Sequence, residues 1–335
     1  MKGNTTRRVA VIFNPVKGEP EEMKQQVIDA ARRHGWEDPE FRETSVEDPG
    51  FAPTQQAAEE GYDMIFAAGG DGTVRAVAAA LRGTGSTLAI IPVGTGNLLA
   101  RNLKLPLDVP EAIETAFSGQ DTRIDVCTAL LTLPDGESEE LDFVVMAGVG
   151  IDAQMIVNTD DDLKKKIGFI AYGVAIAKSL TGGRRLHLTW KLDDAPVRRT
   201  RVHSLIVGNC GDLVASVPLL PDAVANDGHF DLVALRPKGL PGWGLIVGRL
   251  ATQMGRKVIN RLRRRDEQLT GGSGDIEELQ SLPKPEVFEV DGDEVGEVTA
   301  FTVTIEPECL IVREPVPPPT AEPGEPRPGT EVFGG

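Results

Sequence analysis

The sequence predicts an α/β protein in two parts, a parallel sheet covered by helices and then a mainly antiparallel, β-rich domain. In the first third, apolar strand-like runs alternate with segments of helical periodicity. After Asp125 the strand-like segments follow one another, and only two longer helical segments interrupt them. Strands that alternate with helices favour a parallel sheet covered on both faces, whereas successive alternating strands favour antiparallel pairing.

The elements of the first part follow in order along the chain. The run "RRVAVIFNP" is apolar and β-branched, which predicts a buried strand. "EPEEMKQQVIDAARRHGW" has helical spacing, with acidic residues in its first turn and basic residues near its end, as the helix dipole favours. The remaining expected elements are the strand "EFRETSV", the short helix "TQQAAEEG", the strand "DMIFAA", the helix "TVRAVAAALRG", the strand "TLAIIPV" and a helix beginning at "NLLARNL".

The second part contains seven segments that we expect to be strands. They are "RIDVCTALLTL", "LDFVVMAGVG", "RRLHLTWKL", "VHSLIVGNC", "GHFDLVALR", "EVFEVDG" and "FTVTIEP". From about Pro315 the chain is rich in Pro, Gly and Glu, a composition that cannot bury a core and predicts disorder.

The composition limits the class of protein. A chain of 335 residues with 40% hydrophobic residues can fill one large core or two ordinary ones. The net charge of -16 disfavours nucleic acid as a partner. Three cysteines without a CxxC pair indicate neither a disulfide framework nor a thiolate zinc site. No signal peptide is evident, and the longest apolar stretch is roughly half of a membrane span, so we expect a cytoplasmic protein.

A glycine-rich loop, "GGDG", follows the expected strand "DMIFAA" and opens a helix. Free backbone N–H groups and the helix dipole at such a position favour a phosphate. Asp71 is an anion in this loop, and a carboxylate beside a phosphate is repulsive unless a cation such as Mg²⁺ lies between them. The alternative is that Asp71 or Thr73 only caps the helix.

Two further loops favour the nucleotide interpretation. "PVGTGN" lies between an apolar strand and a helix, and "NPVKG" follows the first strand. All three loops would lie at the carboxyl ends of parallel strands, where open α/β sheets bind ligands. The sequence has neither the GxxxxGK[ST] pattern of P-loop proteins nor the HRD and DFG patterns of protein kinases.

These segments resemble the diacylglycerol kinase catalytic-domain family, which includes bacterial lipid kinases and the sphingosine and ceramide kinases. The resemblance rests on "NPVKG", "GGDGTVRAV", "PVGTGNLLARNL", "RIDV", "GVGID", "LLPDAVANDGHFDLVAL" and "VDGDEVG", which occur in the family's order. It implies a Rossmann-like, 6-phosphofructokinase-like nucleotide domain and a C-terminal, mainly antiparallel β-sandwich domain. The domains would be 1–125 for nucleotide, with a returning segment at about 301–313, 126–300 for the lipid substrate, and 314–335 as a disordered tail.

The resemblance also implies a set of site residues. Those at the ATP phosphates and in the nucleotide pocket would be Asn14, Gly69, Gly70, Asp71, Gly72, Thr73, Gly94, Thr95, Gly96 and Asn97. Those at a second, structural Mg²⁺ would be Asp227, the carbonyl groups of Val224 and His229, and Asp125 through water. The alternative for Asp227-Gly228 is a turn that leads into a strand.

The expected general base lies in "VDGDEVG". The family usually has Asp-Gly-Glu there, and Asp293 falls on the glutamate's position although it is one methylene shorter. Strict alternation around Asp291-Gly292 suggests a hairpin tip, since Asp-Gly is a favoured two-residue turn. Glu294 is the competing candidate for the base.

Two departures from the family leave the lipid open. Leu98 follows Asn97 where diacylglycerol kinases commonly have Asp, and Arg75-Ala76 stand where Asn-Glu is common. Arg75 supplies positive charge near phosphate or is a solvated helix residue.

Residues 241–269 and 163–180 combine apolar and basic residues. A helix of residues 241–269 would lie on an anionic bilayer, each basic residue adding about 1 kcal/mol. The alternative is that both segments pack on the β domain.

The sequence therefore predicts an ATP- and Mg²⁺-dependent lipid kinase, peripheral at the membrane, that converts diacylglycerol to phosphatidic acid. The alternatives are a sphingoid- or ceramide-type lipid kinase, a kinase of a soluble substrate such as NAD, and a catalytically weak nucleotide- or lipid-binding regulator. Partners would be a membrane lipid substrate and an anionic membrane surface, without nucleic acid. A homodimer stays open.

Overall fold

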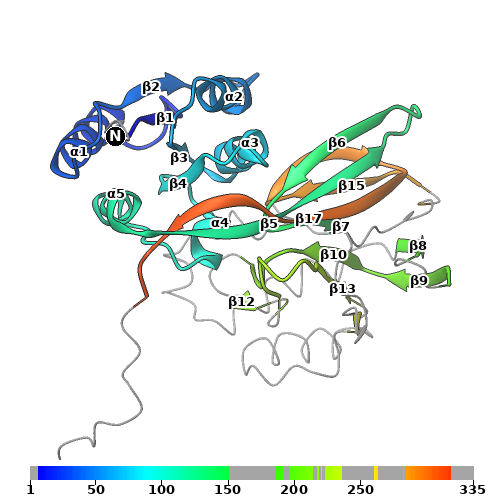
Figure 1. The fold of residues 1–335 in the computed structure, drawn as a ribbon. Coiled ribbons are helices and arrows are strands. Elements are labelled where there is room, and N and C mark those ends of the chain that lie inside the picture. Colours follow the sequence, from blue (N-terminus) through cyan, green and yellow to red (C-terminus); the bar gives the residue numbers. More distant parts are fainter. Residues whose placement is uncertain are drawn as a thin grey trace, which may run out of the picture.

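The structure is a computed structural model, and it describes residues 7–150, 186–191, 196–213, 217–218, 220, 223–235, 260–262, 282 and 284–317. Two sheets dominate it (Figure 1). The predicted segments 163–180 and 241–259, and the tail from residue 318, lie outside the described residues.

The first sheet has seven strands in the order β2-β1-β3-β4-β17-β5-β6. Its N-terminal elements are β1 (Val9–Phe13), α1 (Pro20–Arg33), β2 (Glu40–Glu43), α2 (Phe51–Glu59), β3 (Met64–Gly69), α3 (Asp71–Leu81), β4 (Thr87–Pro92), α4 (Leu98–Asn102) and α5 (Val109–Ser118). Strands β1 to β4 are parallel. Their side chains alternate between two cores: α1 and α5 cover one face, and α2, α3 and α4 cover the other.

Two long strands extend this sheet beyond the helical part. They are β5 (Gln120–Thr132) and β17 (Ala300–Glu314), and β6 (Ser138–Phe143) pairs with β5 at the edge. The end of β17 pairs in parallel with β4, while almost its whole length pairs antiparallel with β5. The last described strand thus returns to the first part of the chain, and both long strands cross the molecule in Figure 1.

The second sheet has six antiparallel strands in the order β14-β13-β10-β7-β15-β16. They are β7 (Met146–Val149), β10 (Ser204–Gly208), β13 (Asp231–Leu235), β14 (Asn260–Leu262), β15 (Glu286–Val290) and β16 (Asp293–Val298). Two small pairs complete the described strands: β8 (Leu186–Trp190) with β9 (Arg198–Val202), and β11 (Asp212–Leu213) with β12 (Val217–Pro218). An apolar core lies between this sheet and the β5-β6-β17 end of the first sheet, which makes a sandwich.

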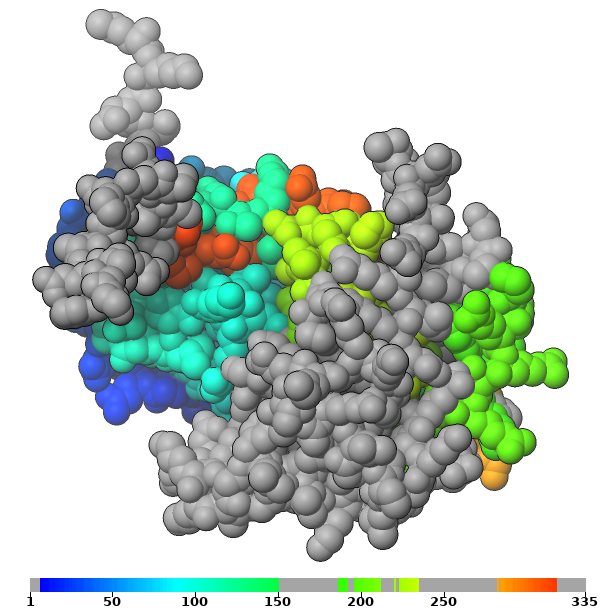
Figure 2. All heavy atoms as spheres, turned by 90° about the horizontal axis from the view of Figure 1, so that it is seen from below, coloured from blue at the N-terminus to red at the C-terminus, as the bar shows by residue number. Residues whose placement is uncertain are grey.

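The predicted fold class is confirmed: an α/β part with a mixed sheet is joined to an antiparallel sheet part. The core on the α2, α3 and α4 face connects them, since its buried residues include Leu98 and Leu99 of α4 together with Leu220 and Val233. In Figure 2 the surface of residues around 100–118 accordingly adjoins that of residues around 223–235.

Three details differ from the sequence-based expectations. "LDFVVMAGVG" is two strands in different sheets, because the amides of Val144 and Val145 donate to the Asp291 carboxylate and leave the ladder. Residues 260–262 form β14 instead of continuing a helix, because they pair with β13. Helix α5, which is not among the expected elements, begins where the Asp108 side chain accepts the Glu111 amide at 3.2 Å.

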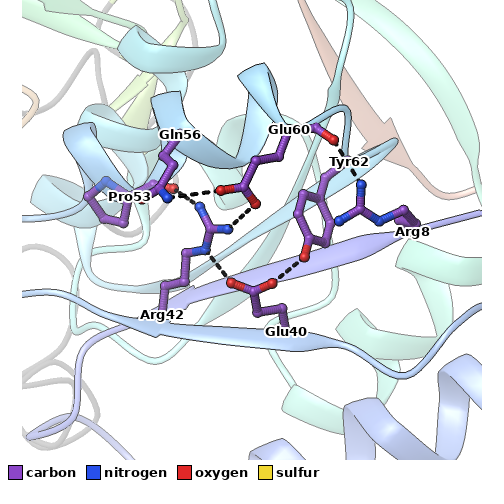
Figure 3. A network of polar contacts seen from close by, with 7 residues as sticks. All are labelled: Arg8, Glu40, Arg42, Pro53, Gln56, Glu60 and Tyr62. Carbon is purple, nitrogen blue, oxygen red and sulfur yellow. Dashed lines mark hydrogen bonds and ion pairs between the residues drawn. The ribbon is translucent and has the colours of Figure 1, made fainter.

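A polar network lies at β2, the edge strand of the first sheet (Figure 3). Arg42 lies 2.8 Å from Glu40 and 2.5 Å from Glu60, and the Tyr62 hydroxyl donates to Glu40. Arg8 stacks over the Tyr62 ring at 4.0 Å and donates to the Glu60 carbonyl at 2.8 Å. The bond from Tyr62 and the Arg42 charge lower the pKa of Glu40. The network ties β2 to α2.

No helix among the described residues is long and apolar enough to cross a bilayer.

Candidate active site

The three predicted loops meet at the carboxyl edge of the parallel strands. The Asn14 amide, after β1, donates to the Ala68 carbonyl near the end of β3 at 3.0 Å, and the Val93 amide donates to the Gly69 carbonyl at 3.2 Å. Asn14 also orders its own loop, because its side-chain oxygen accepts the Val16 amide at 3.0 Å. Loops that precede a helix at this edge are suited to phosphate.

Glycine is needed in two of these loops for close approach. A Cβ on Gly94 would lie 2.6 Å from the Gly70 Cα, so the "GGDG" and "GTGN" loops touch backbone to backbone. A Cβ on Gly96 would lie 2.5 Å from the Asp71 carboxylate. Asn97 adopts a left-handed conformation, with φ of 50°, and its side chain exchanges two hydrogen bonds with Gly94. The two loops therefore form one rigid surface, on which Thr95 is exposed.

Asp71 holds the second loop directly. Its carboxylate accepts the amides of Asn97 at 3.0 Å and Leu98 at 2.5 Å, at the start of α4. Asp71 therefore does act as a helix cap, but it caps the N-terminus of α4 and not that of its own helix. Burial raises the pKa of Asp71 to about 6, the Asp291 and Asp293 charges add to this, and the two amides oppose it.

The first turn of α3 offers backbone N–H groups to a ligand. The helix begins at Asp71 directly after Gly70, which has no side chain to cap it. The first N–H groups of a helix lack partners within the helix, so those of Asp71, Gly72 and Thr73 are suited to binding an anion. Thr73 itself is buried below Gly69.

The β15-β16 hairpin brings Asp293 to this turn. Asp291 and Gly292 form its two-residue tip with φ values of 49° and 91°, the positive values that such a turn requires. Asp293 Oδ2 would lie 3.2 Å from a Cβ on Gly72, and it lies 3.2 Å from Arg75 Nη2. The Asp293 side chain is 50% exposed, so a substrate can reach it.

Asp291, the neighbouring carboxylate, is buried in protein. Its oxygens accept the amides of Val144 at 3.1 Å and of Val145 and Met146 at 2.9 Å each, and its own amide donates to the Met146 carbonyl at 2.8 Å. Burial raises its pKa, while the Arg75 charge and the three amides act against that rise. Asp291 fixes the hairpin tip to the crossover between β6 and β7.

The predicted residues of the second metal gather at a separate place. Asp125 is fully buried and accepts the amides of Gly228 at 2.8 Å and Glu308 at 2.7 Å, and burial followed by the Asp227 charge raises its pKa. Asp227 Oδ1 accepts the His229 amide at 3.1 Å. Among the described residues no three His, Cys, Asp or Glu side chains cluster as metal ligands, so a metal here would rely on carbonyl and water oxygens. Such oxygen donors suit Mg²⁺.

Two arginines join the site beyond the residue set that the resemblance implied, and for one of them, Arg75, the sequence had left two interpretations open. Arg75 donates to the Val290 carbonyl at 2.6 Å, with its side chain only 18% exposed, so it is not the solvated helix residue of the alternative. Arg101 Nε donates to the Gly96 carbonyl at 2.8 Å and steadies the second loop. Arg75 had a sequence signal, because it departs from the residue that is common in the family at this position. Arg101 had none beyond its place after the loop.

Comparison with known proteins indicates that the protein is a kinase. The family described as diacylglycerol kinase catalytic domain matches residues 8–129. The chain is 29% identical over 248 residues to a diacylglycerol kinase of Staphylococcus saprophyticus, covering 72% of this chain and 77% of the relative. It is 26% identical over 246 residues to a diacylglycerol kinase of Staphylococcus aureus, covering 72% and 74%.

Solved structures agree with the fold. The crystal structure of a diacylglycerol kinase from Bacillus anthracis superposes with a TM-score of 0.67 at 21% identity, covering 92% of this chain and 98% of that one. The resemblance found in the sequence is therefore confirmed.

Proposed function

We propose that the protein is an ATP-dependent lipid kinase that phosphorylates diacylglycerol to phosphatidic acid. The observation that carries the proposal is the position of Asp293, an exposed carboxylate from the β-rich part, at Gly72 in the first turn of α3. One carboxylate thus faces the place where a phosphate would be bound. Phosphoryl transfer needs a group beside the bound phosphate that activates the acceptor hydroxyl, and it needs little other covalent chemistry.

The phosphate groups of ATP would lie on the surface of the two glycine loops. The amides of Gly72 and Thr73 at the start of α3 would bind oxygens, and the Thr95-Gly96 segment would form the other wall. Asn14 would complete the nucleotide pocket from the end of β1. The amides of Asn97 and Leu98 already bind Asp71, so they shape the loop instead of binding phosphate.

A Mg²⁺ ion with the nucleotide would neutralise the charge that spreads over the transferred group. Asp71 fits this ion, because its buried carboxylate lies where the two glycine loops meet and its pKa is raised by burial and by neighbouring anions. A cation would relieve both effects. The second Mg²⁺ would bind Asp227 and the carbonyl groups of Val224 and His229, with Asp125 through water.

Asp293 would remove the proton of the lipid hydroxyl as the hydroxyl oxygen attacks the γ-phosphorus, the bond to the β,γ-bridging oxygen breaks and ADP leaves. The hairpin register places Glu294 opposite Glu289 and Asp293 opposite Val290. Consecutive residues of a strand point to opposite faces, so Glu294 points away from the Asp293 face. This geometry favours Asp293 over Glu294 as the base.

We further propose that the enzyme acts from the cytoplasm at an anionic membrane surface, with residues 163–180 and the part of residues 241–269 outside β14 as the contact. Leu98, one of the departures from the family that leave the lipid open, lies buried in the core behind the second loop.

One experiment tests the proposal. Transfer of the γ-phosphate of ATP is measured on diacylglycerol, a sphingoid base, ceramide and soluble NAD, with the lipids in mixed micelles. We expect the fastest transfer to diacylglycerol. Faster transfer to a sphingoid base or ceramide would reassign the lipid, and transfer only to NAD would indicate the soluble-substrate alternative. ATP binding without transfer to any acceptor would indicate a regulator and contradict the proposal.

A further inference from the structure

Arg75 connects the phosphate-loop helix to the hairpin that carries Asp293. It lies one turn into α3, after Asp71 and Gly72. Its Nη1 donates to the Val290 carbonyl at 2.6 Å, and its Nη2 lies 3.2 Å from Asp293 Oδ2. The two contacts flank the two-residue tip of the hairpin on both sides.

The shape of the guanidinium makes these two contacts a geometric constraint. Its amino groups form a rigid, planar fork, so binding two oxygens fixes both the distance and the direction of the hairpin tip relative to α3. A lysine is a compact point charge on a flexible stem and cannot reproduce both bonds. The Arg75 side chain is 18% exposed and that of Asp293 50%, so solvent screens this pair from the Asp293 side.

The charge of Arg75 acts where anions accumulate. The Asp291 and Asp293 charges both raise the pKa of Asp71, so the three carboxylates repel one another. Arg75 counteracts this repulsion at Asp291, because its positive charge lowers the pKa of Asp291 while burial raises it. Without Arg75, the repulsion would push the exposed Asp293 away from the first turn of α3.

Arg82, on the same helix, offers a comparison. Its guanidinium lies 2.8 Å from Asp142 and from the Thr128 hydroxyl, and 3.5 Å from Glu306. It thus ties the end of α3 to β5, β6 and β17, far along the helix from the glycine loops. Both arginines fasten α3 to the β-rich part, and Arg75 is the one of the two that contacts the hairpin.

We propose that Arg75 is a positioning residue that holds the β15-β16 hairpin, and with it the Asp293 carboxylate, over the first turn of α3. This inference rests on the proposed function of Asp293 as the base. A purely structural role would instead make Arg75 equivalent to Arg82.

The kinetic test compares Arg75→Met, Arg75→Lys and Arg82→Met, each alone, and Arg75→Met also with Asp293→Asn. Misplacing a reacting group by about 1 Å costs up to about 10²-fold in rate, so we expect Arg75→Met to lower kcat on the order of 10- to 100-fold. KM for ATP should stay unchanged. Arg75→Lys should be intermediate, and Arg82→Met should lower thermal stability while keeping kcat near that of wild type.

The double variant decides whether Arg75 acts through Asp293. In the Asp293→Asn background, Arg75→Met should lower kcat little further, because the group that it positions is gone. An equal loss of kcat in both backgrounds, or Arg82→Met losing as much kcat as Arg75→Met, overturns the proposal.

A measurement without turnover separates this inference from the proposed function. Amide hydrogen exchange of residues 286–298 should be faster in Arg75→Met than in wild type or Arg82→Met. If wild type transfers phosphate to no lipid, the proposed function fails while faster exchange still supports the positioning contact. Unchanged exchange in Arg75→Met overturns the contact whatever the activity.

Discussion

Asp291 is expected to act through stability, although it lies next to the candidate base. It is 2% exposed and accepts three backbone amides from the β6-β7 crossover. The perturbations are Asp291→Asn, which keeps one acceptor oxygen, and Asp291→Ala, which keeps none.

The structure sets the size of each effect. In Asp291→Asn the remaining side-chain oxygen can still accept the amides of Val145 and Met146, and the new amide group then faces the Val144 N–H. Leaving one buried N–H without an acceptor costs about 1–3 kcal/mol. Relief of the carboxylate burial that raises the pKa of Asp291 offsets part of this, so we expect a loss of about 1–2 kcal/mol.

Asp291→Ala loses more for two reasons. All three amides lose their acceptor, and alanine at a φ of 49° adds strain of about 1–2 kcal/mol, which asparagine largely avoids. Water that enters the site would satisfy some of the amides. We expect a total loss of about 3–5 kcal/mol in the free energy of unfolding.

The assay is urea unfolding followed by circular dichroism, together with ATP affinity and transfer rate for each variant. The midpoint should fall from wild type to Asp291→Asn and again to Asp291→Ala, with an unchanged slope. Below the transition, Asp291→Asn should keep most of its ATP affinity. If Asp291→Asn is as stable as wild type and loses more transfer rate than Asp293→Asn, the reasoning is refuted and Asp291 takes part in the chemistry.

Four further predictions concern the carboxylates at the two sites. Asp71→Asn should cut turnover at least about tenfold in a folded protein, since the carboxylate is the proposed metal ligand. Turnover near that of wild type would show that Asp71 only binds the start of α4 and holds no metal. The wild-type rate should fall as pH drops through about 6, the raised pKa of Asp71. The stability that Asp71 contributes has the opposite pH dependence, because a raised pKa favours the folded state at low pH, and this stability is lost as pH rises through about 6. Mg²⁺ should offset that loss, and an identical pH profile in Asp71→Asn would contradict the assignment. Asp293→Asn should lower the rate by about 10²–10⁴ with ATP affinity barely changed, while Glu294→Gln is mild; a larger loss in Glu294→Gln would make Glu294 the base. Mg²⁺ should raise the melting temperature of wild type more than that of Asp227→Ala, and equal shifts would remove the second metal.

The sequence by itself determined the order of the elements and the composition of the loops. Periodicity indicated β1, α1, β3, α3 and β4, because each has a strong local pattern of apolar residues. The Asp-Gly tip of the hairpin and the glycines before α3 and α4 were also local signals, since turns restrict which residues fit. The tertiary structure confirms the class of fold from these patterns.

Only the tertiary structure decided what the carboxylates contact. Asp71 binds the start of α4, Asp291 binds the β6-β7 crossover, and Arg75 binds the hairpin more than two hundred residues away in the chain. Their partners are mostly backbone amides and carbonyls, which every residue carries, so no pattern of side chains announces them. The same reason explains β14, whose three residues are strand only because β13 lies beside them.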